Sequence, residues 1–184
     1  VNTEERGRYL GAFEDGDQLI AIHKDGSYEL SDLLVDKKYD HNSVLKVFRY
    51  RKGDIISALH FDAEKGRTMV KRFSIETSKL DTKYPFISEA DGAKLYFASV
   101  HPNPKIKYSY KTGGEKHEAT LDFVEFIDVK GWKALGNRLI DHKVLKVTKL
   151  HDDIKVSAKE EVSTKNEEKN NNSISTGDTI ELDL

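Results

Sequence analysis

The stretch from Phe126 to Leu139 reads FIDVKGWKALGNRL, and the rest of the chain is best interpreted outward from it. It holds the only tryptophan, Trp132, between two glycines, Gly131 and Gly136. Glycine lets a backbone turn sharply or approach a partner closely, so the cations beside these glycines project from an irregular backbone. Cations placed in this way suit the phosphates of a polymer better than a small-molecule pocket. The plainer alternative is a basic surface turn whose tryptophan packs against the neighbouring core.

Two further stretches extend this pattern and carry a resemblance to a known family. Together with VKGWKALGNRL at 129–139, LGAFEDGDQLIAIHKDGSYELSDL at 10–33 and VKRFSIET at 70–77 resemble the C-terminal domain of bacterial type IIA topoisomerase A subunits. The likeness is closest to the topoisomerase IV A subunit and its gyrase-A-like relatives, and it covers about residues 8–139. It implies an all-β, propeller-like β-pinwheel that binds and bends double-stranded DNA along a basic rim, without a catalytic residue or cofactor of its own.

The resemblance also implies a setting. In the whole enzyme, the partners are a second A subunit and the ATPase B subunit, and ATP-dependent strand passage decatenates and relaxes DNA in the cytoplasm, at the nucleoid. The gyrase A box of the family reads Gln-Arg-Arg-Gly-Gly-Lys-Gly, and this heptad does not occur here. Lys130 to Gly136 resembles at most a degenerate form. The choice between topoisomerase IV and a gyrase with a degraded box stays open.

Composition divides the chain into two parts. The 184 residues have no cysteine and a formal net charge of −2, and no apolar run approaches the roughly 18 residues that span a membrane. Residues 151–184 hold four lysines and nine acids, whereas residues 1–150 hold 26 cations and 23 acids. We expect a partial pinwheel domain at 1–150 and an acidic, mostly disordered tail at 151–184, because residues 158–177 are too polar to bury a core. The end, DTIELDL, alternates like a short strand or a docking peptide. The polar start without methionine suggests a fragment of a larger protein.

Alternating apolar residues and turn signals predict short strands throughout the first part. Histidines close three similar stretches, IAIHKDG, SALHFDA and ASVHPNP, at His23, His60 and His101, with spacings of 37 and 41 residues. A period near 40 with several strands per unit predicts propeller-like blades of four strands, about three of them here. The expected strands are 10–13, 18–23, 28–34, 44–50, 55–61, 68–76, 95–100, 106–110 and 121–129, with 95–100 and 106–110 forming a hairpin.

The sequence does not favour an enzyme or a metal site. Equivalent positions in successive blades point apart, so the three histidines are not expected to converge on a metal ion. The chain lacks nucleophile-elbow, Walker and dinucleotide-binding motifs. In the family that the chain resembles, the strand-cleaving tyrosine belongs to a different domain.

Cations recur on or beside the predicted strands, and they are the candidate phosphate contacts. Repeated contacts along a rim can follow a bent duplex. An alternative function is a propeller-like protein-interaction module, which a flat salt dependence of DNA affinity would indicate. The predicted DNA-binding residues are Arg49, Arg51, Lys52, Lys71, Arg72, Lys105, Lys107, Lys130, Lys133 and Arg138.

Overall fold

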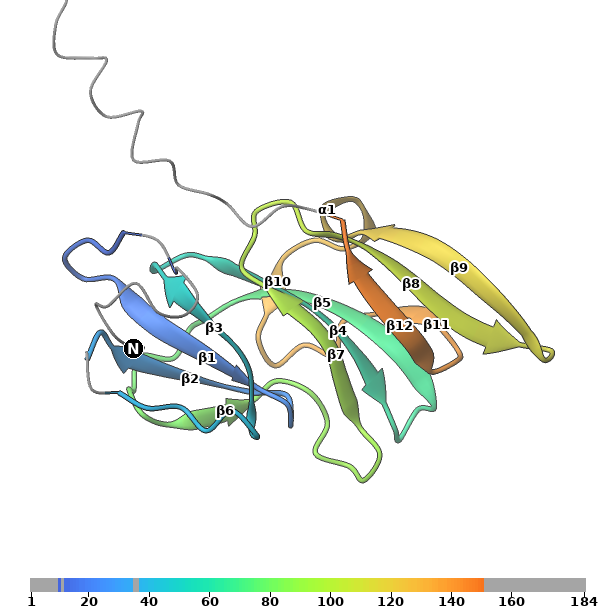
Figure 1. The fold of residues 1–184 in the computed structure, drawn as a ribbon, viewed down its shortest axis with the longest axis horizontal. Helices are drawn as coiled ribbons and strands as arrows, with labels where there is room; N and C mark the ends of the chain where they lie inside the picture. The colour runs from blue at the N-terminus through green and yellow to red at the C-terminus, as the bar shows by residue number, and fades with distance from the viewer. Residues whose placement is uncertain (1–9, 11, 35–36, 151–184) are drawn as a thin grey trace, which may run out of the picture.

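Three sheets and one short helix make up the computed structural model, which describes residues 10, 12–34 and 37–150. The sheets lie in a row, with sheet 1 at the left of Figure 1, sheet 2 in the middle and sheet 3 at the right. Sheet 1 contains β1 (Gln18–His23), β2 (Ser27–Asp32), β3 (Val44–Tyr50) and β6 (Lys83–Pro85). Sheet 2 contains β4 (Ile55–Asp62), β5 (Arg67–Ser74), β7 (Lys94–Ser99), β10 (Lys130–Gly131) and β11 (Asn137–Ile140). Sheet 3 contains β8 (Lys105–Thr112), β9 (Glu115–Asp122) and β12 (Val144–Lys149), and helix α1 covers Phe123–Phe126.

One pairing rule repeats along the chain. Each sheet starts with a hairpin, β1–β2, β4–β5 or β8–β9, and its next strand pairs with the first strand of that hairpin. The second strand of the hairpin is then covered by a strand that comes only after the following hairpin, so β6 pairs with β2, and β10 and β11 pair with β5. Neighbouring sheets are therefore linked by exchanged strands. This confirms the predicted all-β, β-pinwheel-like fold.

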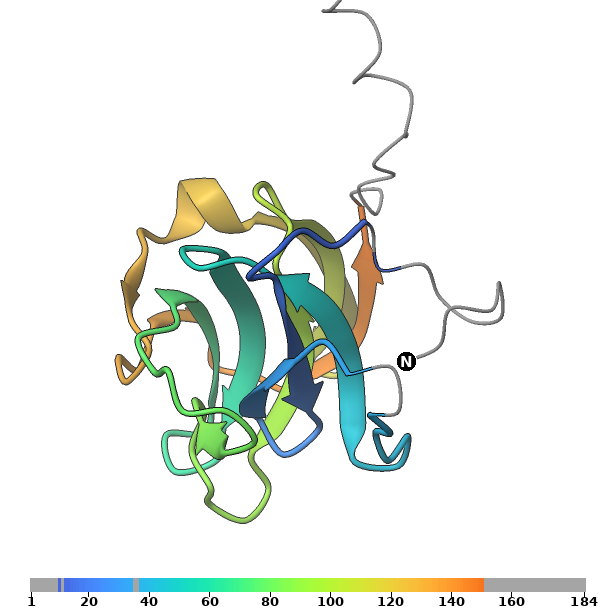
Figure 2. The same cartoon turned by 90° about the vertical axis from the view of Figure 1, so that its left-hand side faces the viewer.

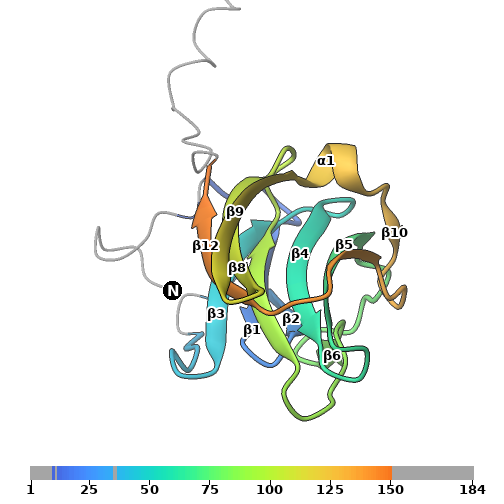
Figure 3. The same ribbon diagram turned by 90° about the vertical axis from the view of Figure 1, so that its right-hand side faces the viewer.

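Sheet 2 is covered on both faces, which explains why β4 is buried along nearly its whole length. Successive side chains of a strand point to opposite faces. Ile56 and Ala58 therefore join a core shared with sheet 1, while Leu59 joins a core shared with sheet 3. The end views in Figures 2 and 3 show the sheets one behind another.

The predicted hairpin between 95–100 and 106–110 is wrong. β7 pairs with β4, and β8 pairs with β9 across a two-residue turn at Gly113 and Gly114, whose φ angles are +58° and +87°. Positive φ at both central residues is the geometry that hairpins of this length favour, and Gly-Gly supplies it. The alignment of the third histidine fails for the same reason, because His101 follows β7, whereas the strand equivalent to β1 and β4 is β8.

Two predicted strands are also absent. Residues 121–129 contain helix α1, because the Asp122 carboxylate accepts hydrogen bonds from the backbone N–H groups of Val124 and Glu125, at 2.9 and 3.4 Å. An acceptor at this position caps the first turn of a helix. The described residues at 10–13 form no strand. In the part of the chain that the structure describes, no helix has the length and apolar character needed to cross a membrane. The predicted disorder of the tail lies outside the described residues.

Candidate nucleic-acid interface

The stretch that contains Trp132 and its two flanking glycines lies along the edge of sheet 2. Residues 130–143, called the basic segment from here on, contain β10, a loop, β11 and a turn, and they follow β5 from Phe73 back to Thr68. Five residues of strand span about 17 Å. The segment therefore presents its side chains along a line about as long as five base pairs of DNA, which rise about 3.4 Å each.

Gly136 fixes the loop of the basic segment against β5. Its φ is +90°, and an added Cβ would lie 2.2 Å from the carbonyl oxygen of Val70. No other residue type fits such a close approach in this backbone conformation. This is the physical reason for one of the two glycines that flank Trp132.

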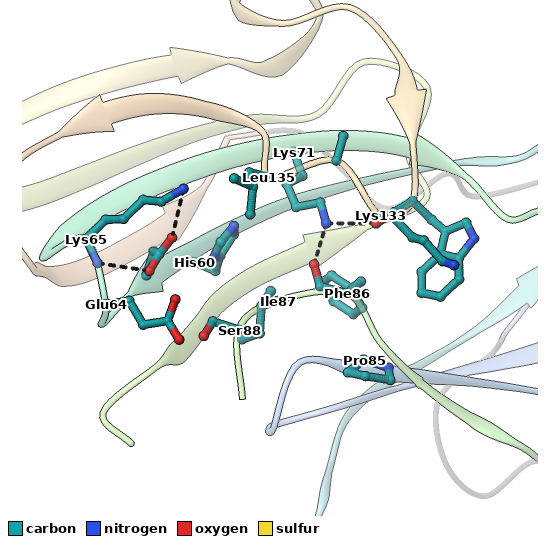
Figure 4. Close-up of a pocket in the computed structure, with 13 residues that line it drawn as sticks. His60, Glu64, Lys65, Lys71, Pro85, Phe86, Ile87, Ser88, Lys133 and Leu135 are labelled. Atoms are coloured by element: carbon teal, nitrogen blue, oxygen red, sulfur yellow. Dashed lines mark hydrogen bonds and ion pairs between the residues drawn. The ribbon is translucent and has the colours of Figure 1, made fainter. Parts of the chain in front are cut away.

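The buried side chain of Lys71 binds the same loop through a hydrogen bond. It is only 4% exposed, and its ammonium group donates hydrogen bonds to the carbonyl oxygens of Phe86 and of Trp132, the latter at 2.9 Å. Figure 4 shows the Lys71 side chain reaching these two oxygens. Phe86 follows β6 of sheet 1, so one side chain connects sheet 1, β5 and the basic segment. Burial lowers the pKa of Lys71 to about 8, because the charged form loses its hydration.

A pocket of about 430 Å³ opens beside Lys71. His60 lies in it, 3% exposed, and burial lowers its pKa to about 4, with the nearby positive charge of Lys71 as a smaller cause. His60 is therefore neutral at pH 7. Neither His60 nitrogen has a side-chain or backbone partner that meets strict hydrogen-bond geometry.

Trp132 is half-buried and packs on the aromatic side chains of sheet 1. Its ring meets Tyr28 and Tyr84 edge-on, with centroids 6.2 and 6.0 Å apart. Edge-to-face contacts at this distance are favourable. Trp132 therefore packs against the neighbouring core, as the plainer alternative from the sequence predicted. This packing does not exclude a basic surface, because the Lys133 ammonium lies over the same ring, 5.2 Å from its centroid.

The cations of the basic segment are exposed and weakly engaged. Lys130 donates to the Asn137 side chain at 2.9 Å, and among the described residues neither Lys130 nor Lys133 has a carboxylate partner. Arg138 lies 3.5 Å from Asp141, but both side chains are more than half exposed. Such a surface ion pair contributes little energy and is easily exchanged for another anion.

Lys71 and Arg72 occupy opposite faces of β5, because neighbouring residues of a strand alternate. Lys71 faces sheet 1 and is buried, so the prediction that it contacts phosphate is corrected: its charge points inward. Arg72 faces sheet 3, where it donates to the backbone oxygen of Ile127 at 3.1 Å and is partly covered.

The remaining predicted cations, in or just after β3 and in sheet 3, differ in whether they pair with carboxylates. The Arg51 guanidinium lies 2.9 Å from Glu14 and 3.1 Å from Asp17, and Arg49 also lies 3.8 Å from Asp17. The hydrogen bond from Arg51 to Asp17 raises the pKa of Arg51. Lys52, in contrast, is exposed and has no acidic partner among the described residues.

Lys105 and Lys107 are paired across the β8–β9 hairpin. Lys105 lies 2.6 Å from Asp122 and Lys107 lies 2.5 Å from Glu118, which also pairs with Lys116 at 3.0 Å. The hydrogen bonds from Lys107 and Lys116 lower the pKa of Glu118 to about 2. Carboxylates of the same hairpin therefore neutralise most of its positive charge.

The structure adds Lys143 to the candidate contacts, at the end of the basic segment. Its ammonium lies 5.0 Å from the centre of the Phe61 ring, and it has no acidic partner among the described residues. The sequence held a signal for it: VLKVTK alternates like a strand, and assigning β12 would have placed Lys143 in an exposed turn. No group of three or more potential metal ligands gathers among the residues that the structure describes.

Comparison with known proteins supplies the family. The family described as topoisomerase C-terminal domain, Bacteroidota, matches residues 1–151. No curated protein and no solved structure matches the chain. Because the family match covers most of the 184 residues and all of the described sheets, this chain belongs to the bacterial topoisomerase C-terminal domain family.

Proposed function

We propose that this chain binds and bends double-stranded DNA as the non-catalytic C-terminal domain of a type IIA topoisomerase A subunit of the topoisomerase IV kind. The observation that carries the proposal is the basic segment, which presents Lys130, Lys133, Arg138 and Lys143 along one sheet edge with a single acid, Asp141, among them. The segment binds phosphates and steers a duplex to the catalytic core of the topoisomerase. That core performs ATP-dependent strand passage, decatenation and relaxation with the ATPase B subunit, at the nucleoid.

The chemistry of the segment favours backbone contacts over base recognition. Its cations stand on an irregular edge, and the only helix among the described residues, α1, has four residues and is too short to fill a major groove. Contacts to phosphate fix position and carry no sequence information. Binding is therefore expected to be independent of sequence, and a repeated row of sheets allows contacts to follow a bent duplex.

The test is the salt dependence of affinity for a random duplex, measured by fluorescence anisotropy. Each phosphate contact contributes about 0.9 to the slope of log K against log salt. The variant Lys130→Ala, Lys133→Ala, Arg138→Ala is expected to bind more weakly, with a slope reduced by up to about 2.7. Energy transfer between dyes at the two ends of the duplex reports bending in the same samples.

A matched control removes the same charge from another place. The variant Lys105→Ala, Lys107→Ala, Lys116→Ala also loses three cations, but each of these is paired with a carboxylate. Its slope is expected to stay close to that of the unmodified chain. Equal losses in the two variants would mean that net charge, not the basic segment, governs binding. No binding by the unmodified chain at 50 mM salt would favour the protein-interaction module instead.

A further inference from the structure

Within residues 37–150, sheet 3 has no strand in the place where the pairing rule of the other two sheets supplies one. β2 is covered by β6, and β5 is covered by β10 and β11. β9 stands in the equivalent place in sheet 3, and no strand of the described residues pairs with its outer edge. An open edge offers unpaired N–H and C=O groups to another strand. In Figure 1, β9 lies at the outer edge of sheet 3, with β8 between it and β12.

The spacing of the covering strands indicates where its partner lies in the chain. β6 begins at Lys83, 33 residues after β3 ends at Tyr50, and β10 begins at Lys130, 31 residues after β7 ends at Ser99. β12 is the third strand of sheet 3 and ends at Lys149. The same two offsets lead to positions 180 and 182, which fall within the sequence DTIELDL at 178–184.

We propose that residues 178–184 pair with the outer edge of β9 as the fourth strand of sheet 3. The pattern of the segment suits this position, because Ile180, Leu182 and Leu184 alternate with polar residues. On β9 the inward side chains are buried Leu121 and half-buried Ala119, which belong to the core between sheets 2 and 3. A strand added in register extends this apolar face with Ile180 and Leu182, and it keeps Glu181 and Asp183 on the solvent side.

Charge favours the same pairing. The strands of sheet 3 hold six lysines and three acids, whereas DTIELDL holds three acids and no cation. Two of the three acids of β9 oppose the approach only weakly, since Glu118 is paired with two lysines and Asp122 with Lys105. The added strand would bring sheet 3 close to neutrality.

The connection is long enough. The 27 residues from 151 to 177 are mostly polar, and a random coil of that length would span about 30 Å on average. Crossing from β12 over β8 to the far edge of β9 takes three strand spacings, about 14 Å. A tether in this regime holds the segment at an effective concentration on the order of millimolar, so a weak strand contact is sufficient.

The test compares the full chain with a chain ending at Gly177, by backbone amide hydrogen exchange. Amides of β9 that point away from β8 are expected to exchange at least about tenfold more slowly in the full chain, because a covering strand protects them. The variant Ile180→Asn, Leu182→Asn is expected to lose this protection. The control variant Thr179→Asn, Asp183→Asn, altered on the opposite side of the segment, is expected to keep most of it.

A second arm identifies the occupant of the edge. A peptide DTIELDL, added at millimolar concentration to the shortened chain, is expected to restore protection of β9, and a scrambled peptide is not. Identical exchange of β9 in the full and shortened chains would overturn the proposal. So would protection of β9 in the shortened chain accompanied by a dimer mass in light scattering, because a second copy would then cover the edge. Neither outcome bears on DNA binding, which the basic segment supports independently.

Discussion

The basic segment and the β8–β9 hairpin carry the same number of cations and differ in what those cations face. Residues 130–143 contain four cations and one acid, and residues 105–122 contain four cations and three acids. In the hairpin, the antiparallel register places Lys105 directly opposite Asp122. In the basic segment, Lys130 lies opposite Phe73 and Arg138 lies opposite Met69. In the part of the chain that the structure describes, the strand register therefore places no carboxylate opposite either cation. The positive potential of a β protein therefore depends on strand register as much as on charge count.

The largest effect is expected from a substitution that pushes the basic segment away from β5. Gly136→Ala places a Cβ against the Val70 carbonyl at φ +90°, so we expect a loss of at least about 3 kcal/mol in unfolding free energy and weaker DNA binding. Gly113→Ala, at the hairpin tip with φ +58° and open space around it, is expected to cost only about 1 kcal/mol. Urea unfolding measures both variants. Equal costs would mean that backbone strain alone matters and that the close approach at Val70 does not.

A somewhat smaller effect concerns the lysine that connects the segment to sheet 1. The pKa of Lys71 falls from 10.5 unfolded to about 8 folded, so between these values the unfolded chain binds more protons. Stability of the unmodified chain should therefore rise with pH from about 8 to 10.5, by an amount on the order of 2 kcal/mol. Lys71→Met should lack this rise.

The comparison of the two chains isolates Lys71, because the tyrosines that titrate near pH 10 are common to both. Lys71→Met should also be less stable at pH 7, since it leaves the carbonyl oxygens of Phe86 and Trp132 without a donor. Denaturant unfolding at several pH values measures the difference. Parallel pH profiles would show that the Lys71 ammonium titrates normally and is not confined.

Much of the fold was predictable because the main strands of sheets 1 and 2 have local sequence signals. Gln18–His23 and Val44–Tyr50 have the predicted bounds, since alternation and an Asp-Gly turn act within a few residues. The covering strands β6 and β10 were not predictable. They have three and two residues, and they are held by partners far away in the chain.

The candidate site was predictable in part, for a related reason. The sequence identified Lys130, Lys133 and Arg138 through the glycines and tryptophan beside them. It could not distinguish Lys71 from Arg72, because both faces of β5 are covered and polarity alone does not show which cation is enclosed. It also could not show that Lys107 faces Glu118, since that contact depends on the register of a hairpin whose Gly-Gly turn was not recognised.

A further experiment frees lysines of the β8–β9 hairpin from their carboxylate partner, so that they resemble the cations of the basic segment. Glu118→Gln removes the carboxylate that holds Lys107 and Lys116, at 2.5 and 3.0 Å. Two lysines are then free to contact phosphate, so DNA affinity at low salt is expected to increase several-fold and the salt slope to steepen by up to about 1.8. Thr120→Ser, on the same face of β9, is the control. Unchanged affinity of the Glu118→Gln variant would place sheet 3 outside the path of the duplex.

The smallest expected effect concerns the acidic residues that follow sheet 3. Residues 151–184 carry a net charge of −5, against +3 for residues 1–150. A tethered anionic segment competes with phosphate for the basic segment at high effective concentration, even when each contact is weak. Exposed charges more than about 10 Å apart are screened at 0.1 M salt, so the competition is modest. A chain ending at Leu150 is therefore expected to bind DNA a few-fold more tightly at low salt, and the gain is expected to shrink as salt rises. The chain ending at Gly177 separates the contribution of DTIELDL from that of residues 151–177, because it keeps six of the nine acids and removes only DTIELDL. Equal affinity of all three chains at low salt would show that the acidic residues do not reach the basic segment.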